Sequence, residues 1–138
     1  MGLDMYLLKK RATSIDPEDY THIGYWRKAN HIHNWFVEEI QNGEDDQNLY
    51  AVTKEKAEEL RDICIDVLKE FDGNGVLTGN EKTVKGLLPC VGGFLFGSTD
   101  YDDGYYEDVK KTVSLLNDAL SGKTIDWDNE TLYYSCWW

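Results

Sequence analysis

The sequence lacks the positive charge and the long hydrophobic runs that mark nucleic-acid-binding and membrane proteins. Its 14 basic residues are outnumbered by 26 acidic residues, and the resulting net charge of −12 repels nucleic-acid phosphates and anionic membranes. The longest apolar stretches, such as residues 87–96, are much shorter than a bilayer span and contain proline and glycine. We therefore expect no nucleic-acid partner, no membrane partner and no transmembrane segment.

Cysteine is scarce, and the first residues do not resemble a leader. The three cysteines, Cys64, Cys90 and Cys136, are odd in number and lack C-x-x-C spacing, so neither a disulfide framework nor a zinc site is predicted. Residues 1–10 have neither the basic start nor the long apolar centre of a secretory signal. We expect free thiols in a reducing compartment, the cytoplasm.

Familiar catalytic and cofactor motifs are missing as well. The chain contains no G-x-S-x-G or H-E-x-x-H motif, and the glycines of residues 92–98 lack the lysine of a phosphate-binding loop. His31 and His33 are two residues apart, about 200° around a helix, and cannot bind one metal from one face. We predict no catalytic residue, no cofactor and no metal ligand, which favours a binding protein over an enzyme.

One segment does match part of a calcium-binding loop. Residues 70–81, EFDGNGVLTGNE, place oxygen-bearing side chains at positions three, five and nine of an EF-hand loop, a glycine at six and Glu81 at twelve. Glu70 stands where an aspartate is expected, and the chain has no second loop to pair with this one. Calcium binding is therefore an alternative that we do not favour.

The residues that are present predict one folded domain over 1–138. With 41% hydrophobic and 13% aromatic residues, a chain of 138 residues can build a core. Hydrophobic periodicity, β-prone residues, caps and glycine stops predict short strands and three helices. The predicted strands cover residues 3–7, 49–52, 94–96 and 131–138, residues 20–23 are a β-prone stretch, and the predicted helices cover residues 25–41, 53–71 and 105–120. The expected fold is α+β or α/β, with a small sheet of about four strands and three helices packed on it.

The most unusual segment is residues 25–36, YWRKANHIHNWF. On a helical wheel, His33 falls inside the apolar arc, so we expect it to be buried and to hydrogen-bond a backbone carbonyl. Trp35 is out of place, because it falls on the polar side. That side also carries Arg27, Lys28, His31 and Asn34. One interpretation is that the unusual residues of the segment serve packing alone.

The charges of this predicted helix favour a second interpretation. If the helix begins near Gly24, Arg27 and Lys28 lie in its first turn, and Glu38 and Glu39 lie in its last turn. Both ends then carry the wrong sign for the helix dipole, which favours an anion beside the first turn. Together with aromatic rings for stacking and polar groups for hydrogen bonds, this suits a nucleotide-like molecule. The predicted ligand-binding residues are Tyr25, Trp26, Arg27, Lys28, Asn30, His31, His33 and Trp35.

Four segments together resemble a family of small proteins encoded by bacteriophages and prophages. These segments are MGLDMYL at the start, YWRKANHIHNWFV at 25–37, LLPCVGGFLFGSTDYDDGYYED at 87–108 and YYSCWW at the end. The family has no assigned function, and the resemblance implies a protein of the infected bacterial host's cytoplasm. Residues 71–86 depart from the family's usual insert, which implies that the EF-hand match is a chance hairpin sequence.

Three functions follow as hypotheses. In the first, the protein acts during infection by sequestering an anionic nucleotide-like small molecule, such as a host-defence signal, with Arg27 and Lys28 clamping the phosphate. In the second, its acidic surface binds a host or phage protein through Trp35 and the terminal Trp137–Trp138, which a homodimer would also bury. In the third, it is a small enzyme acting on a nucleotide, with His31 or His33 as general base.

Overall fold

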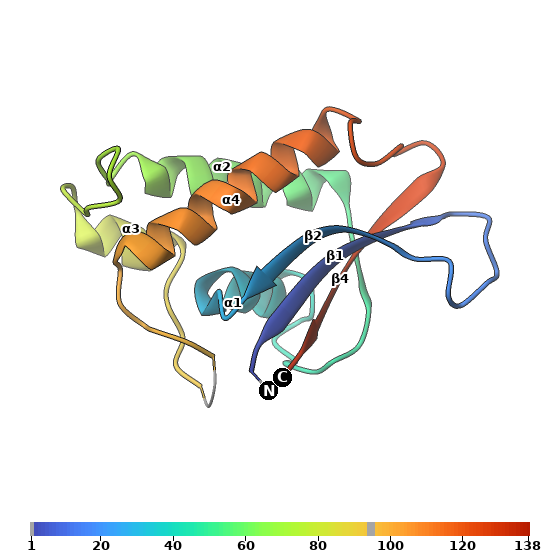
Figure 1. The fold of residues 1–138 in the computed structure, drawn as a ribbon, viewed down its shortest axis with the longest axis horizontal. Helices are drawn as coiled ribbons and strands as arrows, with labels where there is room; N and C mark the ends of the chain where they lie inside the picture. The colour runs from blue at the N-terminus through green and yellow to red at the C-terminus, as the bar shows by residue number, and fades with distance from the viewer. Residues whose placement is uncertain (1, 94–95) are drawn as a thin grey trace.

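A computed structural model describes residues 2–93 and 96–138. Figure 1 shows its arrangement, with α2 and α4 lying side by side; α4 contacts both α1 and β2. In chain order, the elements are β1 (Asp4–Arg11), β2 (Thr21–Arg27), α1 (Asn30–Glu39), β3 (Tyr50–Val52), α2 (Lys54–Leu68), α3 (Glu81–Leu87), α4 (Asp103–Leu120) and β4 (Glu130–Trp137).

The strands form one antiparallel sheet in the order β2-β1-β4-β3. The first strand lies in the interior of the sheet, so Met5 has Trp26 on one side and Cys136 on the other. Alternation along the strands turns these side chains, with Leu7 and Tyr134, toward the core, where all are buried. The α+β fold with four strands is confirmed, as are strands close to the predicted 3–7, 49–52 and 131–138.

Two long helices match their sequence patterns. Helix α2 begins at Thr53, whose hydroxyl accepts a hydrogen bond from the Lys56 backbone N–H, as an N-cap residue does. Helix α4 begins after Asp102, whose carboxylate accepts from the Tyr105 N–H. Their buried residues recur every three or four positions, so each helix lays one apolar face on the core.

The predicted helix at residues 25–41 is wrong at its beginning. Residues 25–27 belong to β2, where Tyr25 pairs with Tyr6 of β1. Lys28 then turns the chain with a positive φ of 56°, and α1 begins only at Asn30. Arg27 and Lys28 therefore lie before the helix, and the predicted charge mismatch at its first turn does not exist. The acidic last turn is real, and Glu39 there lies 3.6 Å from the Lys56 Nζ.

One helix was not predicted. Residues 81–87 form α3, capped by the Asn80 side chain, which accepts from the Lys82 and Thr83 N–H groups. The predicted strand at 94–96 includes two residues outside the described part of the chain, and Phe96 lies in no strand. The structure thus has four helices around the sheet within its described residues, where three were predicted.

The segment that resembles an EF-hand loop is a tight turn between α2 and α3. Phe71 and Leu77 face each other in an isolated antiparallel bridge. The Asp72 carboxylate accepts hydrogen bonds from the backbone N–H groups of Asn74 and Val76, and the Glu70 carboxylate accepts from that of Asn80. These acidic groups stabilise a turn, as aspartate often does.

None of the helices in the described part of the chain combines the length and the apolar character that a membrane span requires.

Candidate functional site

A small pocket lies between α1 and the chain that follows α3. Its volume is about 190 Å³, below the range of about 300–1,000 Å³ that is typical of sites for drug-sized ligands. We call it the α1 pocket. It is lined by His31, Asn34, Trp35, Glu38, Glu39, Leu87, Leu88 and Pro89. A cavity of this size suits a single ring system rather than a whole nucleotide.

His31 and Trp35 reach this pocket because they lie four residues apart on one face of α1. The helical wheel placed both residues on the polar side, yet the two side chains are only 3% and 5% exposed. The reason is tertiary packing, since the His31 ring stacks on Tyr105 of α4 with centroids 4.1 Å apart. Leu88, which follows α3, is buried beside them.

Each of the two side chains also carries a buried polar atom without a partner. Neither Nε2 of His31 nor Nε1 of Trp35 has a hydrogen-bond partner, and they are two of four such buried atoms among the described residues. Leaving a buried polar group without a partner costs about 1–3 kcal/mol, so groups of this kind are unusual in a folded core. A ligand that hydrogen-bonds both atoms would recover this free energy.

The two nitrogens offer opposite hydrogen-bonding roles. Burial lowers the pKa of His31 to about 3, while a hydrogen bond with the Tyr105 backbone favours a proton on the ring. The imidazole is therefore neutral near pH 7, and we assign its one N–H to that backbone contact, which leaves Nε2 as an acceptor. The Trp35 indole can only donate. Two side chains that line the pocket thus carry one unpartnered acceptor and one unpartnered donor.

The charge around the pocket is acidic. Glu38 and Glu39 line it, and no lysine or arginine is among its lining residues. Arg27 is at the end of β2, where its guanidinium lies 3.3 Å from the Asp4 carboxylate. Lys28 borders a different hollow, together with three aspartates of the 100–108 region. The structure therefore does not bring the two predicted phosphate ligands to the pocket that contains His31 and Trp35.

The other predicted ligand-binding residues have structural partners. The Trp26 indole is buried and donates to the Thr112 hydroxyl at 2.9 Å, and the Tyr25 hydroxyl donates to Asp4. Asn30 joins α1 to three residues that precede α4: its amide donates to the Phe96 and Ser98 carbonyls and accepts from the Val91 N–H. These contacts hold the base of α1 in place.

His33 is buried, as expected, but its predicted backbone partner is wrong. Its Nδ1 lies 2.7 Å from the Tyr134 hydroxyl and its Nε2 lies 2.8 Å from the Asp45 carboxylate, because α1 packs against β4 and the loop after the helix returns to it. Nearby, the Cys136 thiol donates to the Asp46 carbonyl at 3.3 Å. Burial raises the pKa of this thiol to about 12, so it does not act as a nucleophile in this state.

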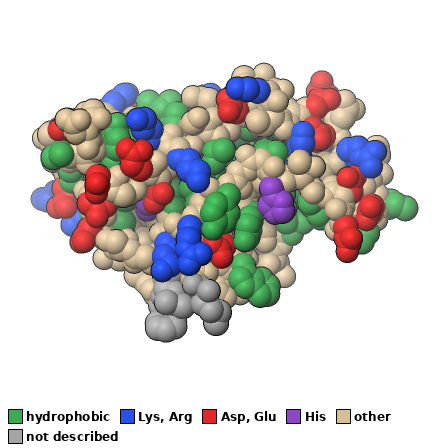
Figure 2. Space-filling view, viewed as in Figure 1, with side chains coloured by type: hydrophobic (Ala, Val, Ile, Leu, Met, Phe, Trp, Pro, Cys, Tyr) green, Lys and Arg blue, Asp and Glu red, His purple; other side chains and the backbone are tan. Residues whose placement is uncertain are grey.

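A larger hollow of about 290 Å³ lies where α4 ends, beside the start of α2. Two of its polar side chains are already bonded: the Trp127 indole donates to the Ala119 carbonyl, and the Asp126 carboxylate accepts from the Asp128 backbone N–H and the Asn129 amide. Figure 2 shows one face of the molecule, on which acidic and basic side chains are interspersed. The α1 pocket is distinguished from this hollow by its unpartnered nitrogens.

Comparison of the chain with protein-family models, with curated proteins and with solved structures found no match.

Proposed function

We propose that this protein is a binding module that captures a nucleotide-like small molecule by inserting its planar base into the α1 pocket. The observation that supports this most directly is that two side chains lining one pocket, His31 and Trp35, each carry a buried nitrogen without a hydrogen-bond partner. Nucleobases carry donors and acceptors on neighbouring positions of one edge. A base would satisfy both protein atoms, and its ring would replace water against Leu88 and Pro89.

The size and charge of the pocket limit which part of such a ligand is bound. A volume of about 190 Å³ leaves no room for a sugar and phosphate beside a base. Glu38 and Glu39 at the pocket repel a phosphate group, because like charges in a partly desolvated site are unfavourable. The phosphate would remain outside, so the base supplies the affinity and an anionic group adds little.

The resemblance to phage and prophage proteins is the ground for the biological part of the proposal. Capture would occur in the cytoplasm of the infected bacterium, where removal of a nucleotide-like signal would counter a host defence. Such a protein needs affinity rather than catalysis, and a pocket that is already formed reduces the entropy lost on binding.

Thermal unfolding with a panel of nucleosides and their 5′-monophosphates tests the proposal. A ligand present at 100 times its Kd stabilises a protein by about 2.7 kcal/mol, which raises Tm by roughly 10 °C for a domain of this size. At least one nucleoside should produce such a shift, and its monophosphate should produce no larger one. The Trp35→Phe variant keeps a ring but lacks the indole donor, so it should lose most of the shift.

Trp137→Phe is the matched control, because Trp137 is 62% exposed and lies outside the pocket. This variant should retain the full shift. The proposal is contradicted if no nucleoside stabilises the protein, or if Trp35→Phe responds as the natural sequence does. A shift that requires the phosphate and disappears in Lys28→Ala would instead support the cation clamp predicted from the sequence.

A protein partner is the second candidate function, and it rests on a different observation. Trp137 remains 62% exposed at the end of β4, on the strand that pairs with β1, and Tyr25 of β2 is 41% exposed. Exposed aromatic side chains of this kind commonly anchor protein interfaces. Loss of a co-purifying protein in Trp137→Ser, with nucleoside binding unchanged, would favour this function.

A further inference from the structure

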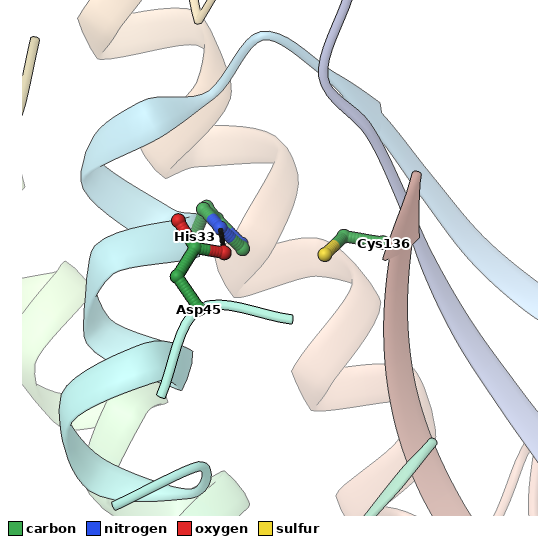
Figure 3. A group of neighbouring side chains, drawn as sticks. All are labelled: His33, Asp45 and Cys136. Atoms are coloured by element: carbon green, nitrogen blue, oxygen red, sulfur yellow. Dashed lines mark hydrogen bonds and ion pairs between the residues drawn. The ribbon is translucent and has the colours of Figure 1, made fainter. Parts of the chain in front are cut away.

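Three metal-binding side chains converge from separate parts of the chain beside the sheet. His33 projects from α1, Asp45 from the loop after it, and Cys136 from β4, and their ligand atoms all lie within 4.8 Å of one another. Figure 3 shows the Cys136 sulfur directed toward the His33–Asp45 pair. Within the described residues, this is the one such group of three or more histidine, cysteine, aspartate or glutamate side chains. It is separate from the α1 pocket, since none of the three lines that pocket.

We propose that His33 Nε2, a carboxylate oxygen of Asp45 and Cys136 Sγ form a binding site for one divalent transition-metal ion, with zinc preferred. Imidazole, carboxylate and thiolate are all zinc ligands, and three protein ligands leave a fourth tetrahedral position for water. The thiolate selects zinc over the hard cations calcium and magnesium. This site is independent of nucleoside capture.

The distances require only small movements. Tetrahedral zinc bonds place a nitrogen and an oxygen ligand roughly 3.3 Å apart, and either of them roughly 3.6 Å from the sulfur. The Nε2 and Oδ1 atoms are now 2.8 Å apart, so they would separate by about half an ångström. The sulfur, within 4.8 Å of both, would move closer to them by at most about 1.2 Å. Asp45 can make this adjustment because it lies in a loop and its side chain is 38% exposed.

Charge balance also favours a divalent ion here. A neutral imidazole, a carboxylate and a thiolate carry two negative charges in total, so the complex with a dication is neutral. Neutrality matters because His33 and Cys136 are 2% exposed, and an unbalanced charge at this depth is unfavourable. The thiol proton that now points to the Asp46 carbonyl would be released to solvent when the metal–sulfur bond forms.

The surroundings of His33 resemble the outer shell of a metal site. A histidine that binds metal through Nε2 usually donates its Nδ1–H to a fixed oxygen, which sets the ring orientation. Here that oxygen is the Tyr134 hydroxyl, 2.7 Å away. Tyr134 is itself held in place, because its ring stacks on Phe36 with centroids 3.8 Å apart. Apolar rings also surround the imidazole, with Phe96 and Trp138 at 5.6 and 6.5 Å between centroids.

Cobalt(II) titration of the reduced, metal-free protein tests the site. Tetrahedral cobalt gives visible absorption bands, and a cobalt–thiolate bond adds a charge-transfer band in the near ultraviolet. We expect both bands to saturate at one equivalent of cobalt and to disappear when zinc is added. Cys136→Ser should abolish the thiolate band, whereas Cys90→Ser should keep it, because Cys90 lies outside the group.

A second variant keeps the test decisive if Cys136→Ser does not fold. Asp45→Asn changes a partly exposed loop side chain and retains a hydrogen-bonding group, and it should weaken zinc binding roughly tenfold or more, since even outer-shell changes cost 10–100-fold. The proposal is overturned if no thiolate band forms. It is equally overturned if the band survives in Cys136→Ser, or if Asp45→Asn binds zinc as tightly as the natural sequence.

Discussion

Replacing Asp108 with asparagine should change how the stability of the protein depends on pH. Asp108 lies on α4, and burial, together with the charges of Asp102 and Glu107, raises the pKa of its carboxyl to about 6, although Lys111 opposes the shift. In the unfolded chain this pKa returns to its ordinary value of 3.8. Between these two values the folded protein binds more protons than the unfolded chain.

This difference in bound protons sets the direction in which stability changes with pH. A raised carboxyl pKa adds stability that is fully present below pH 3.8 and is lost as pH rises through about 6. At pH 5 the folded state holds about one more proton at this site than it does at pH 8. Integration over this range gives about 1.4 kcal/mol. The asparagine variant lacks this contribution.

Urea unfolding followed by tryptophan fluorescence at pH 5 and pH 8 measures the effect. The stability at pH 5 minus that at pH 8 should be about 1.4 kcal/mol more favourable in the natural sequence than in Asp108→Asn. Groups such as His31, whose pKa is lowered by burial, act in the opposite direction but equally in both proteins. Asp118→Asn, on the same helix, is the control. Identical pH dependence in Asp108→Asn and the natural sequence would refute the reasoning.

Three further predictions concern the contacts around α1 and the exposed end of β4. Asn30→Ala should lower the free energy of unfolding by roughly 2–4 kcal/mol in urea, because it leaves the backbone groups of three residues that precede α4 unpaired; a loss under 1 kcal/mol would contradict this. Gly97→Ala should destabilise more than Gly43→Ala, since both glycines have a positive φ but only at Gly97 would a Cβ lie 2.8 Å from the Lys28 carbonyl; equal thermal shifts would count against this close packing. If Trp137 is buried in a homodimer, light scattering should show dimers that dissociate in Trp137→Ser, and a monomer at all concentrations would exclude that dimer.

Elements that are determined by neighbouring residues in the sequence could be predicted from local sequence patterns. Helix α2 has a capping threonine and apolar residues at helical spacing, and β1 alternates apolar and polar residues, so both were predicted. The beginning of α1 was not, because residues 25–27 become a strand through pairing with β1, some twenty residues away. Tyr25 and Trp26 are compatible with either a helix or a strand, so their residue types do not indicate which of the two forms.

The candidate site was predicted only in part, for a similar reason. His31 and Trp35 were both named, and the position of Trp35 on the polar side of the wheel was the signal that this side is covered. The covering residues, Leu88 and Pro89, carry no such signal, because only the tertiary fold brings them to α1. The grouping of His33 with Cys136 also depends on the fold, since about one hundred residues separate them.

The central claim, that the α1 pocket binds a base through Trp35, is tested most directly by NMR of the indole N–H groups. The chain has five tryptophans, and two of their N–H groups serve as internal references, because Trp26 and Trp127 already donate to protein oxygens. On titration with a nucleoside that stabilises the protein, the Trp35 Nε1–H resonance should move downfield, while the two references stay in place. An unchanged Trp35 resonance at saturating nucleoside would contradict the account.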